Sequence, residues 1–448
     1  MRNDRFRRVR KGAEGFRKVL AVCVLATVSM SMSAQQPDPF RSVAERYVKL
    51  VLAVGQHDAD YVDAFYGPPA WRKEAEATKV SLDAIDQQAA ALETAVGAVL
   101  IAPREARDRE LWALRRQYLV RQVAALRARV AMLKGKKFTF DEESVALYDA
   151  VAPTRTEAEF ELVLKQLEAK LPGTATLIDR YDRFKQAFVI PTAKVDRVFQ
   201  EAIRACRERT LSFVPLPPDE RFTVEYVTGK SWGGYNWYQG GYKSLIQVNT
   251  DLPIYIDRAL DLACHEGYPG HHVYNVLLEK HLVKDRGWIE YTVYPLFSPQ
   301  SLIAEGTANF GIEVAFSPAD RVSYEKDVLF PLAGLDVKRV QEYYDVLALV
   351  DKLSYAGNEA ARRYLNGTID RAAAVVWLER YAMFPKPRAE QRVKFIDQYR
   401  SYVINYNLGK DLIRAYIEKK AGKDATVARR WREFAALLSS PRLPSGLK

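Results

Sequence analysis

The chain has 448 residues, of which 48% are hydrophobic, and a formal net charge of +11. Eight Lys/Arg and two Asp/Glu lie in the first 34 residues, so the rest carries only about +5, too little to indicate nucleic-acid binding. No long block of like charge, of the kind that forms an interaction tail, follows residue 34.

The N-terminus has the pattern of a secretory signal peptide. Basic residues dominate positions 1–18, the uncharged stretch Val19–Ala34 follows, and cleavage is predicted after Ser33 or Ala34. We therefore expect residues 1–34 to be removed and the protein to be periplasmic or secreted. The apolar stretch is shorter than the about 20 residues that span a bilayer. No stable membrane span is expected after cleavage, and an uncleaved anchor is the alternative.

Residues 35–448 are predicted to form a single, mainly helical domain with two halves, about 35–215 and 216–448, because no long linker, low-complexity segment or repeat divides them. Thr156 and Glu159 form a capping box that predicts the start of a helix. Apolar residues recur at spacings of three and four at Leu119, Val123, Leu126, Val130 and Leu133. Other amphipathic stretches occupy residues 41–55, 83–99, 175–210 and 320–438.

Residues 215–253 differ from these helical stretches. They are rich in Gly, Tyr, Trp and β-branched residues, and short strands are predicted at Phe222–Val227 and Ser244–Asn249. Between the strands, the segment Gly233–Tyr242 is either a loop that lines a cleft or a hairpin connection packed by aromatic residues. The expected architecture is a helical body divided by a cleft, with a small β-sheet beside the helix described next.

Three of the five histidines lie in the segment Cys264–His272, together with Glu266. Imidazole and carboxylate groups are the usual ligands of catalytic zinc, which keeps one coordination position open for water. A glutamate next to a liganding histidine can accept the proton of that water. The segment therefore predicts a metal site with Glu266 as its general base.

The spacing of the histidines requires an interrupted helix. On a regular helix His271 would lie roughly 240° around from His265, and His272 about 10 Å along the axis, so neither could share an ion with His265. Pro269 and Gly270 interrupt the helical backbone. We predict an irregular turn that brings His271, or alternatively His272, beside His265.

A third ligand is expected on the apolar stretch Ser301–Glu313, which has the pattern of a buried helix. A buried carboxylate is unfavourable unless it is paired or bound to a cation, and Glu305 meets that description. Asn309 or Glu313, on the same face, could hydrogen-bond the second nitrogen of a liganding histidine. The weaker rivals for the third ligand are Glu279 and Glu290.

Two cysteines, Cys206 and Cys264, follow residue 34. They could form a disulfide in an oxidising compartment, but the sequence does not show whether they lie close enough. Cys264 occupies an apolar position directly before His265, and we interpret it as a small buried side chain rather than a ligand.

The run His-Glu-x-x-Pro-Gly-His-His at residues 265–272, followed by Glu305-Gly306, resembles the large bacterial domain-of-unknown-function family 885. That family is similar to the helical zinc peptidases called gluzincins. The resemblance covers most of the chain after about residue 40 and includes Gly135–Tyr148, Gln247–Asn249 and the motif Tyr406-x-x-Gly409.

The resemblance implies a gluzincin-like helical body and one zinc ion held by His265, His271 and Glu305. It also implies Glu266 as the base, a peptidase-like activity, and Tyr406 as the group that stabilises the oxyanion.

The chain departs from the family pattern at two places. Thr307 stands where the family usually has Trp, which leaves the ligand intact but changes the pocket wall. Arg400-Ser401-Tyr402 stands where Pro-Gly-Gln is expected, which weakens the role carried over to Tyr406 and leaves Tyr402 as its competitor.

The expected function is zinc-dependent hydrolysis of small or unfolded peptides. A zinc-dependent amidase or esterase acting on a non-peptide substrate is the first alternative, because the same water activation serves either bond. A non-catalytic metal-binding or peptide-binding protein is the second, and the presence of Glu266 speaks against it. Exo- or endo-cleavage and the oligomeric state do not follow from the sequence.

Overall fold

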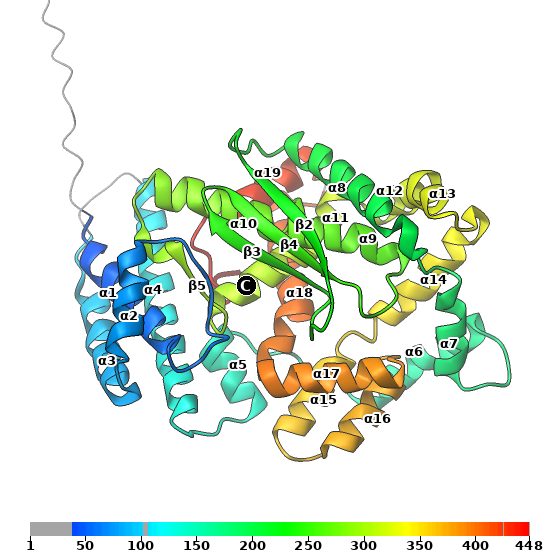
Figure 1. The fold of residues 1–448 in the computed structure, drawn as a ribbon, viewed down its shortest axis with the longest axis horizontal. Helices are drawn as coiled ribbons and strands as arrows, with labels where there is room; N and C mark the ends of the chain where they lie inside the picture. The colour runs from blue at the N-terminus through cyan, green and yellow to red at the C-terminus, as the bar shows by residue number, and fades with distance from the viewer. Residues whose placement is uncertain (1–37, 102–105, 424, 448) are drawn as a thin grey trace, which may run out of the picture. The chain divides into compact units, whose positions relative to one another are not determined.

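The computed structural model describes residues 38–447 except 102–105 and 424, so the predicted signal peptide lies outside the described residues. Helices make up 67% of the structure and strands 7%, which confirms the prediction of a mainly helical fold with a small sheet (Figure 1). Within the described part of the chain, no helix combines the length and the apolar character that crossing a bilayer requires.

The first half of the chain is helical. Its helices are α1 (Arg41–Val54), α2 (Pro69–Thr78), α3 (Leu82–Ala98), α4 (Ala106–Leu133), α5 (Phe140–Tyr148), α6 (Glu157–Lys170), α7 (Leu177–Gln186) and α8 (Val195–Leu211). Helix α3 packs along α4, and both contact α1. The apolar stripe predicted around Val123 lies on the buried face of α4. Thr156 and Glu159 form the predicted capping box of α6.

The second half adds the helices that surround the histidine segment. They are α9 (Ile256–Leu262), α10 (His271–Leu278), α11 (Pro299–Ala315), α12 (Pro318–Tyr324), α13 (Phe330–Ala333), α14 (Val340–Asp351), α15 (Ala356–Leu365), α16 (Arg371–Tyr381), α17 (Lys386–Tyr399), α18 (Ile404–Ala421) and α19 (Val427–Leu438). Buried apolar residues from Phe40 to Leu447 form one hydrophobic cluster, so both halves share a core.

A three-stranded sheet lies at the start of the second half of the chain. It consists of β2 (Arg221–Val227), β3 (Gly234–Gly240) and β4 (Lys243–Asn249). The strand order is β2-β4-β3, with β2 parallel and β3 antiparallel to β4 (Figure 1). The two predicted strands are confirmed.

The segment Gly233–Tyr242, expected as a loop or hairpin connection, is a third strand over most of its length. The glycines of this segment do not interrupt the strand. Gly240, Gly241 and Tyr242 have φ angles of 76°, 60° and 61° and form the turn into β4. The strand lies beside the histidine segment, and Gly234, Tyr235 and Asn236 line a cavity there, as the first of the two alternatives expects.

A second, two-stranded sheet is not predicted from the sequence. Strand β1 (Val62–Phe65) pairs antiparallel with β5 (Val293–Pro295), and β1 also contacts β3. Because of this pairing, Asp63, which is about 200 residues away in sequence, faces the histidine segment.

Helices α11 and α18 cross in backbone contact (Figure 1). A Cβ atom on Gly306 would lie 2.5 Å from the carbonyl carbon of Gly409, and one on Gly409 would lie 2.9 Å from the carbonyl oxygen of Leu302. Neither position has room for a side chain. This crossing holds α18 directly against the residue that follows Glu305.

Candidate metal centre

The chain makes an irregular turn between α9 and α10, as the spacing of His265 and His271 predicts. Residues Ala263–Gly267 form a π-helical turn, and α10 begins at His271. The amide of Gly270 donates to the carbonyl of Cys264 at 2.9 Å. A Cβ atom on Gly270 would lie 1.8 Å from the carbonyl oxygen of His265, so glycine is required for this close return of the chain.

A disulfide joins this turn to α8. Cys206 and Cys264 are bonded, with their Cα atoms 5.8 Å apart, and both side chains are fully buried. Cys264 is therefore not available as a metal ligand. Instead, it attaches the residue before His265 to a neighbouring helix.

The side chains of His265, His271 and Glu305 come together at one point. The Nε2 atoms of the two histidines are 3.1 Å apart, and Glu305 Oε2 lies 3.3 Å from His265 Nε2 and 3.6 Å from His271 Nε2. Ligand atoms around a tetrahedral zinc ion, with bonds of about 2.0–2.2 Å, are themselves about 3.3–3.6 Å apart. The triangle therefore has the dimensions of three zinc ligands.

The chemistry of this triangle also fits a cation. Glu305 is 7% exposed, and its Oε2 atom is buried without a hydrogen-bond partner among the described residues. An ionised carboxylate in such a place is unfavourable unless a positive charge compensates for it. Two imidazoles and one carboxylate are a common ligand set of catalytic zinc, so these residues fit one such ion.

The pKa shifts of Glu305 and His271 in the metal-free protein are consistent with a site for a cation. Burial acts to raise the pKa of Glu305, but the nearby His265 and His271 outweigh it and lower that pKa well below its usual range. Burial acts to lower the pKa of His271, but Glu305 outweighs it and raises the pKa to about 9. A proton on His271 thus balances the carboxylate where a metal ion would otherwise do so.

The second nitrogen of His265 is held as predicted by Asn309, whose Oδ1 lies 3.2 Å from His265 Nδ1. Such a contact fixes the orientation of a liganding imidazole. Glu313, the other candidate for this role, instead pairs with Lys410 at 2.9 Å and Arg414 at 2.6 Å. Its place one turn further along α11 directs it away from the histidines.

His272, the alternative ligand, points away from the triangle. Its Nε2 lies 2.9 Å from Glu220 Oε2, and its Nδ1 lies 2.9 Å from the hydroxyl of Ser244. Glu220 also accepts hydrogen bonds from Arg207 and Tyr268, each at 2.7 Å. With both ring nitrogens engaged and no exposed surface, His272 has a structural role.

The two rival glutamates are also occupied elsewhere. Glu279 accepts hydrogen bonds from the Tyr238 hydroxyl at 2.6 Å and from the amide of Gly241 at 3.2 Å. Glu290 is fully buried against Arg115, whose NH2 group donates to it at 3.0 Å. Neither carboxylate faces the histidine triangle.

Glu266, the predicted base, is 4% exposed and directly follows His265 in the turn. Its Oε2 atom has no hydrogen-bond partner among the described residues. Strand β3 approaches it so closely that a Cβ on Gly234 would lie 2.9 Å from Glu266 Oε1. Burial raises the pKa of Glu266, and the neighbouring His265 and His271 partly oppose that rise. A carboxylate in this environment has the raised basicity that a general base needs.

The two candidate tyrosines have different roles. Tyr402 donates its hydroxyl to Glu305 Oε1 at 2.8 Å, so it orients the carboxylate of the triangle. The Tyr406 hydroxyl has no hydrogen-bond partner in the described part of the chain, and the residue lines the same cavity. Tyr406 is therefore free to donate to a ligand, whereas Tyr402 is not.

The structure adds a pair that the sequence does not indicate. The hydroxyl of Tyr235 donates to Asp63, and both residues line the cavity with His271. Burial raises the pKa of Asp63 to about 6, against the opposing effects of Tyr235 and His271. Nothing in the local sequence of β1 marks Asp63, because only the pairing of β1 with β5 brings it here.

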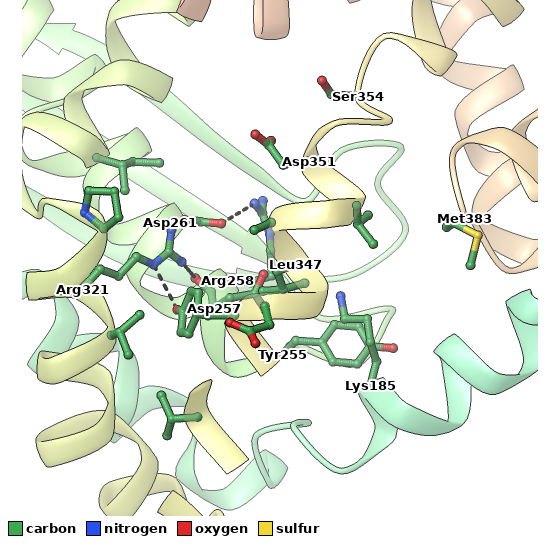
Figure 2. A pocket seen from close by; sticks show the side chains of 18 of the residues that line it. Lys185, Tyr255, Asp257, Arg258, Asp261, Arg321, Leu347, Asp351, Ser354 and Met383 are labelled. Carbon is green, nitrogen blue, oxygen red and sulfur yellow. Dashed lines mark hydrogen bonds and ion pairs between the residues drawn. The ribbon is translucent and has the colours of Figure 1, made fainter. Parts of the chain in front are cut away.

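These residues line a cavity of about 480 Å³, which contains the histidine triangle, Glu266 and Tyr406. A larger cavity of about 1430 Å³ shares part of its wall with the first, including Arg258, Asp261 and Tyr406. Figure 2 shows the larger cavity, where Arg258 and Arg321 both reach Asp261. The triangle thus lies in a hollow that has room for a small ligand.

Comparison with known proteins identifies no family. No family model matches the chain, and no curated protein matches it. Among solved structures, a candidate lipoprotein from Colwellia psychrerythraea is 14% identical with a TM-score of 0.49, over 84% of this chain and 71% of that one. A candidate lipoprotein of unknown function from Shewanella oneidensis is 13% identical with a TM-score of 0.42, over 93% and 79%. A protein named BsuCP is 12% identical with a TM-score of 0.45, over 89% and 88%.

Proposed function

We propose that this protein is a zinc-dependent hydrolase, a metallopeptidase that cleaves small or unfolded peptides outside the cytoplasm. The observation that supports the proposal most strongly is the triangle of His265, His271 and Glu305, with ligand atoms 3.1–3.6 Å apart. A buried carboxylate, Glu266, adjoins it. Membership of domain-of-unknown-function family 885, inferred from the motif at residues 265–272, is part of the same proposal.

His265 Nε2, His271 Nε2 and Glu305 Oε2 would hold the ion, with Asn309 and Tyr402 orienting two of these ligands. When bound, zinc supplies a Lewis acid that polarises a carbonyl and lowers the pKa of water. His271 must lose its proton to act as a ligand, and the ion would then compensate the charge of Glu305 in its place.

The proton transfers belong to Glu266. Its carboxylate accepts the proton of the attacking water and later delivers it to the leaving amine. Its burial between the turn and Gly234 keeps bulk water away from this carboxylate and raises its pKa. The hydroxyl of Tyr406, which has no hydrogen-bond partner among the described residues, would donate to the oxygen of the scissile carbonyl as negative charge develops on it.

Export is the second part of the proposal. The N-terminal pattern of residues 1–34 favours a cleaved signal peptide. The bond between Cys206 and Cys264 supports the same location, because disulfides persist mainly in oxidising compartments.

The decisive experiment replaces the base and leaves the triangle intact. A Glu266→Gln protein should still bind one zinc ion per chain, measured by elemental analysis. Its kcat on a digested peptide mixture, followed by mass spectrometry, should fall by about 10³-fold or more. Glu168→Gln is the matched control, because Glu168 is an exposed residue of α6 and undergoes the same chemical change.

Two results would overturn the proposal. Full activity in zinc-loaded Glu266→Gln would show that another group is the base. Peptide binding without cleavage in the zinc-loaded wild-type protein would favour a non-catalytic binding role. Cleavage of esters or acyl amides but not of peptides would keep the chemistry and change the substrate.

A further inference from the structure

Two arginines one turn apart on α17 face the cavity of the metal triangle. Arg388 and Arg392 both line the 480 Å³ cavity that contains His265, His271 and Glu305. Among the described residues, neither guanidinium has a carboxylate within ion-pair distance. Cations that line a cavity without a protein counter-charge are available to a negatively charged ligand.

The neighbouring arginines differ in this respect, as Figure 2 shows for the adjoining cavity. Arg258 pairs with Asp261 at 3.2 Å, and Arg321 pairs with the same carboxylate at 2.8 Å. Asp261 is thus shared by two cations. Arg258 and Arg388 line both cavities, so two guanidinium groups lie on the wall that the cavities share.

Arg392 is held in place without being neutralised. Its guanidinium lies 4.8 Å from the ring centre of Phe395 and 5.7 Å from that of Tyr406. Stacking on rings positions a guanidinium while leaving its N–H edge free for a planar acceptor. Its Nε atom is buried and has no hydrogen-bond partner within the described chain. Arg392 therefore lies beside the ring of Tyr406, the residue whose hydroxyl is assigned to the oxyanion.

We propose that Arg388 and Arg392 bind a carboxylate of the substrate and so place the neighbouring peptide bond at the metal triangle. This inference rests on the proposed hydrolase function and specifies its substrate class: peptides that carry a free carboxylate close to the cleaved bond. Two guanidinium forks match the planar, two-oxygen shape of a carboxylate. The carboxylate comes either from the C-terminus of the peptide, which makes the enzyme a carboxypeptidase, or from an acidic side chain.

Binding measurements separate these sources without depending on catalysis. The probes are three N-acetylated tetrapeptides: a free acid without acidic residues, its C-terminal amide, and the same amide with one internal glutamate. Their affinities are measured by calorimetry on Glu266→Gln protein, with and without zinc. A hydrogen bond to a charged group contributes about ten- to a hundredfold in affinity. At least one carboxylate-bearing peptide should therefore bind tighter than the uncharged amide by about that factor.

The outcomes are distinct. Tighter binding of the free acid identifies a chain terminus, and tighter binding of the glutamate peptide identifies an acidic side chain. Equal affinity for all three peptides, or no binding of any, overturns the proposal. Because no turnover is measured, a protein that binds carboxylates but cleaves nothing would refute the hydrolase function and leave the carboxylate site standing.

Variants on α17 assign the preference to the two arginines. In the Glu266→Gln background, Arg388→Gln and Arg392→Gln should each reduce the carboxylate preference at least tenfold, with no change in affinity for the uncharged amide. Arg392→Lys, which keeps the charge but not the fork, should retain part of the preference. Lys394→Gln is the control, since Lys394 is exposed on the same helix and lines neither cavity. An undiminished preference in both arginine variants overturns the assignment.

Discussion

Two neighbouring histidines at the start of α10 belong to clusters of opposite character. His272 has a partner for each ring nitrogen, and its carboxylate partner Glu220 is itself held by Arg207 and Tyr268. His271 faces a second imidazole and a carboxylate oxygen that lacks a hydrogen-bond partner among the described residues. Both clusters are made of histidine and glutamate. Only in the second do the nitrogen and oxygen atoms that could bind a metal ion point to one place.

The difference shows how a structural cluster can be told from a ligand cluster. Buried polar groups in folded proteins are almost always hydrogen-bonded. A network complete within the protein, like that of His272, needs nothing further. In the network of His271, two imidazole nitrogens 3.1 Å apart lie beside a carboxylate oxygen with no hydrogen-bond partner among the described residues, so a cation can complete it. Satisfaction of hydrogen bonds, more than residue type, therefore distinguishes the two.

The largest expected effect concerns the ligand carboxylate. Glu305→Gln keeps the shape of the side chain but removes its charge, and zinc affinity should fall by more than about a hundredfold, beyond the loss typical of outer-sphere changes. Competition with a chromophoric chelator measures this affinity. Glu313→Gln, on the same helix and paired with Arg414, should bind zinc like the wild type. If the two variants bound zinc equally well, Glu305 would not be a zinc ligand.

The complementary change is made in the structural cluster. His272→Ala removes a buried partner of Glu220, and the free energy of unfolding should fall by about 2–3 kcal/mol, as expected for a lost charge-assisted hydrogen bond. Zinc stoichiometry should remain one per chain. Denaturant unfolding of chelator-treated protein tests the first point, with the more exposed His281→Ala as control. If the His272→Ala protein lost zinc binding but kept its stability, His272 rather than His271 would be the ligand.

The smallest effect involves Asp63, the carboxylate that borders the triangle. Its pKa is raised to about 6 in the folded protein, so the folded state binds more protons than the unfolded state between about pH 4 and 6. The stability of the metal-free protein therefore falls as pH rises through this window and levels off above it.

Asp63→Asn keeps an acceptor for Tyr235 and removes the titration. The variant should match the wild type near pH 4 and exceed it by about 2 kcal/mol above pH 7, a value reduced from the full shift because water reaches part of this side chain. Thermal unfolding across pH measures the difference. Zinc, by adding positive charge nearby, should shrink it. A constant difference at every pH would show that folding does not shift the pKa of Asp63.

Local signals are enough to predict much of the candidate metal centre. The interruption at Pro269-Gly270 predicted the turn that joins His265 and His271, because both partners lie within one short segment. Glu305 was identified from the unfavourable burial of a carboxylate on an apolar helix. The helical class, the capping box of α6 and two of the strands also followed from local patterns.

The remaining features depend on contacts between distant segments. The sequence predicts a cleft-lining loop or a hairpin connection where the structure has strand β3, which does line the cavity and whose Gly234 lies close to Glu266. Asp63 and Arg392 reach the site through strand pairing and helix packing, which no local sequence pattern indicates. The sequence does not decide which of Tyr402 and Tyr406 is free to donate to a ligand. That depends on which of the two hydroxyls donates to Glu305, and the structure shows that it is Tyr402.

The crossing of α11 and α18 at Gly306 and Gly409 determines how the site can vary. With main chain touching main chain, no rotamer can absorb a change there, so an added methyl group would separate the helices. Such a separation would move Tyr402, which lies just before α18, away from Glu305 on α11. The hydrogen bond that orients this carboxylate is thus set by the thickness of two bare backbones, at two glycines that line neither cavity.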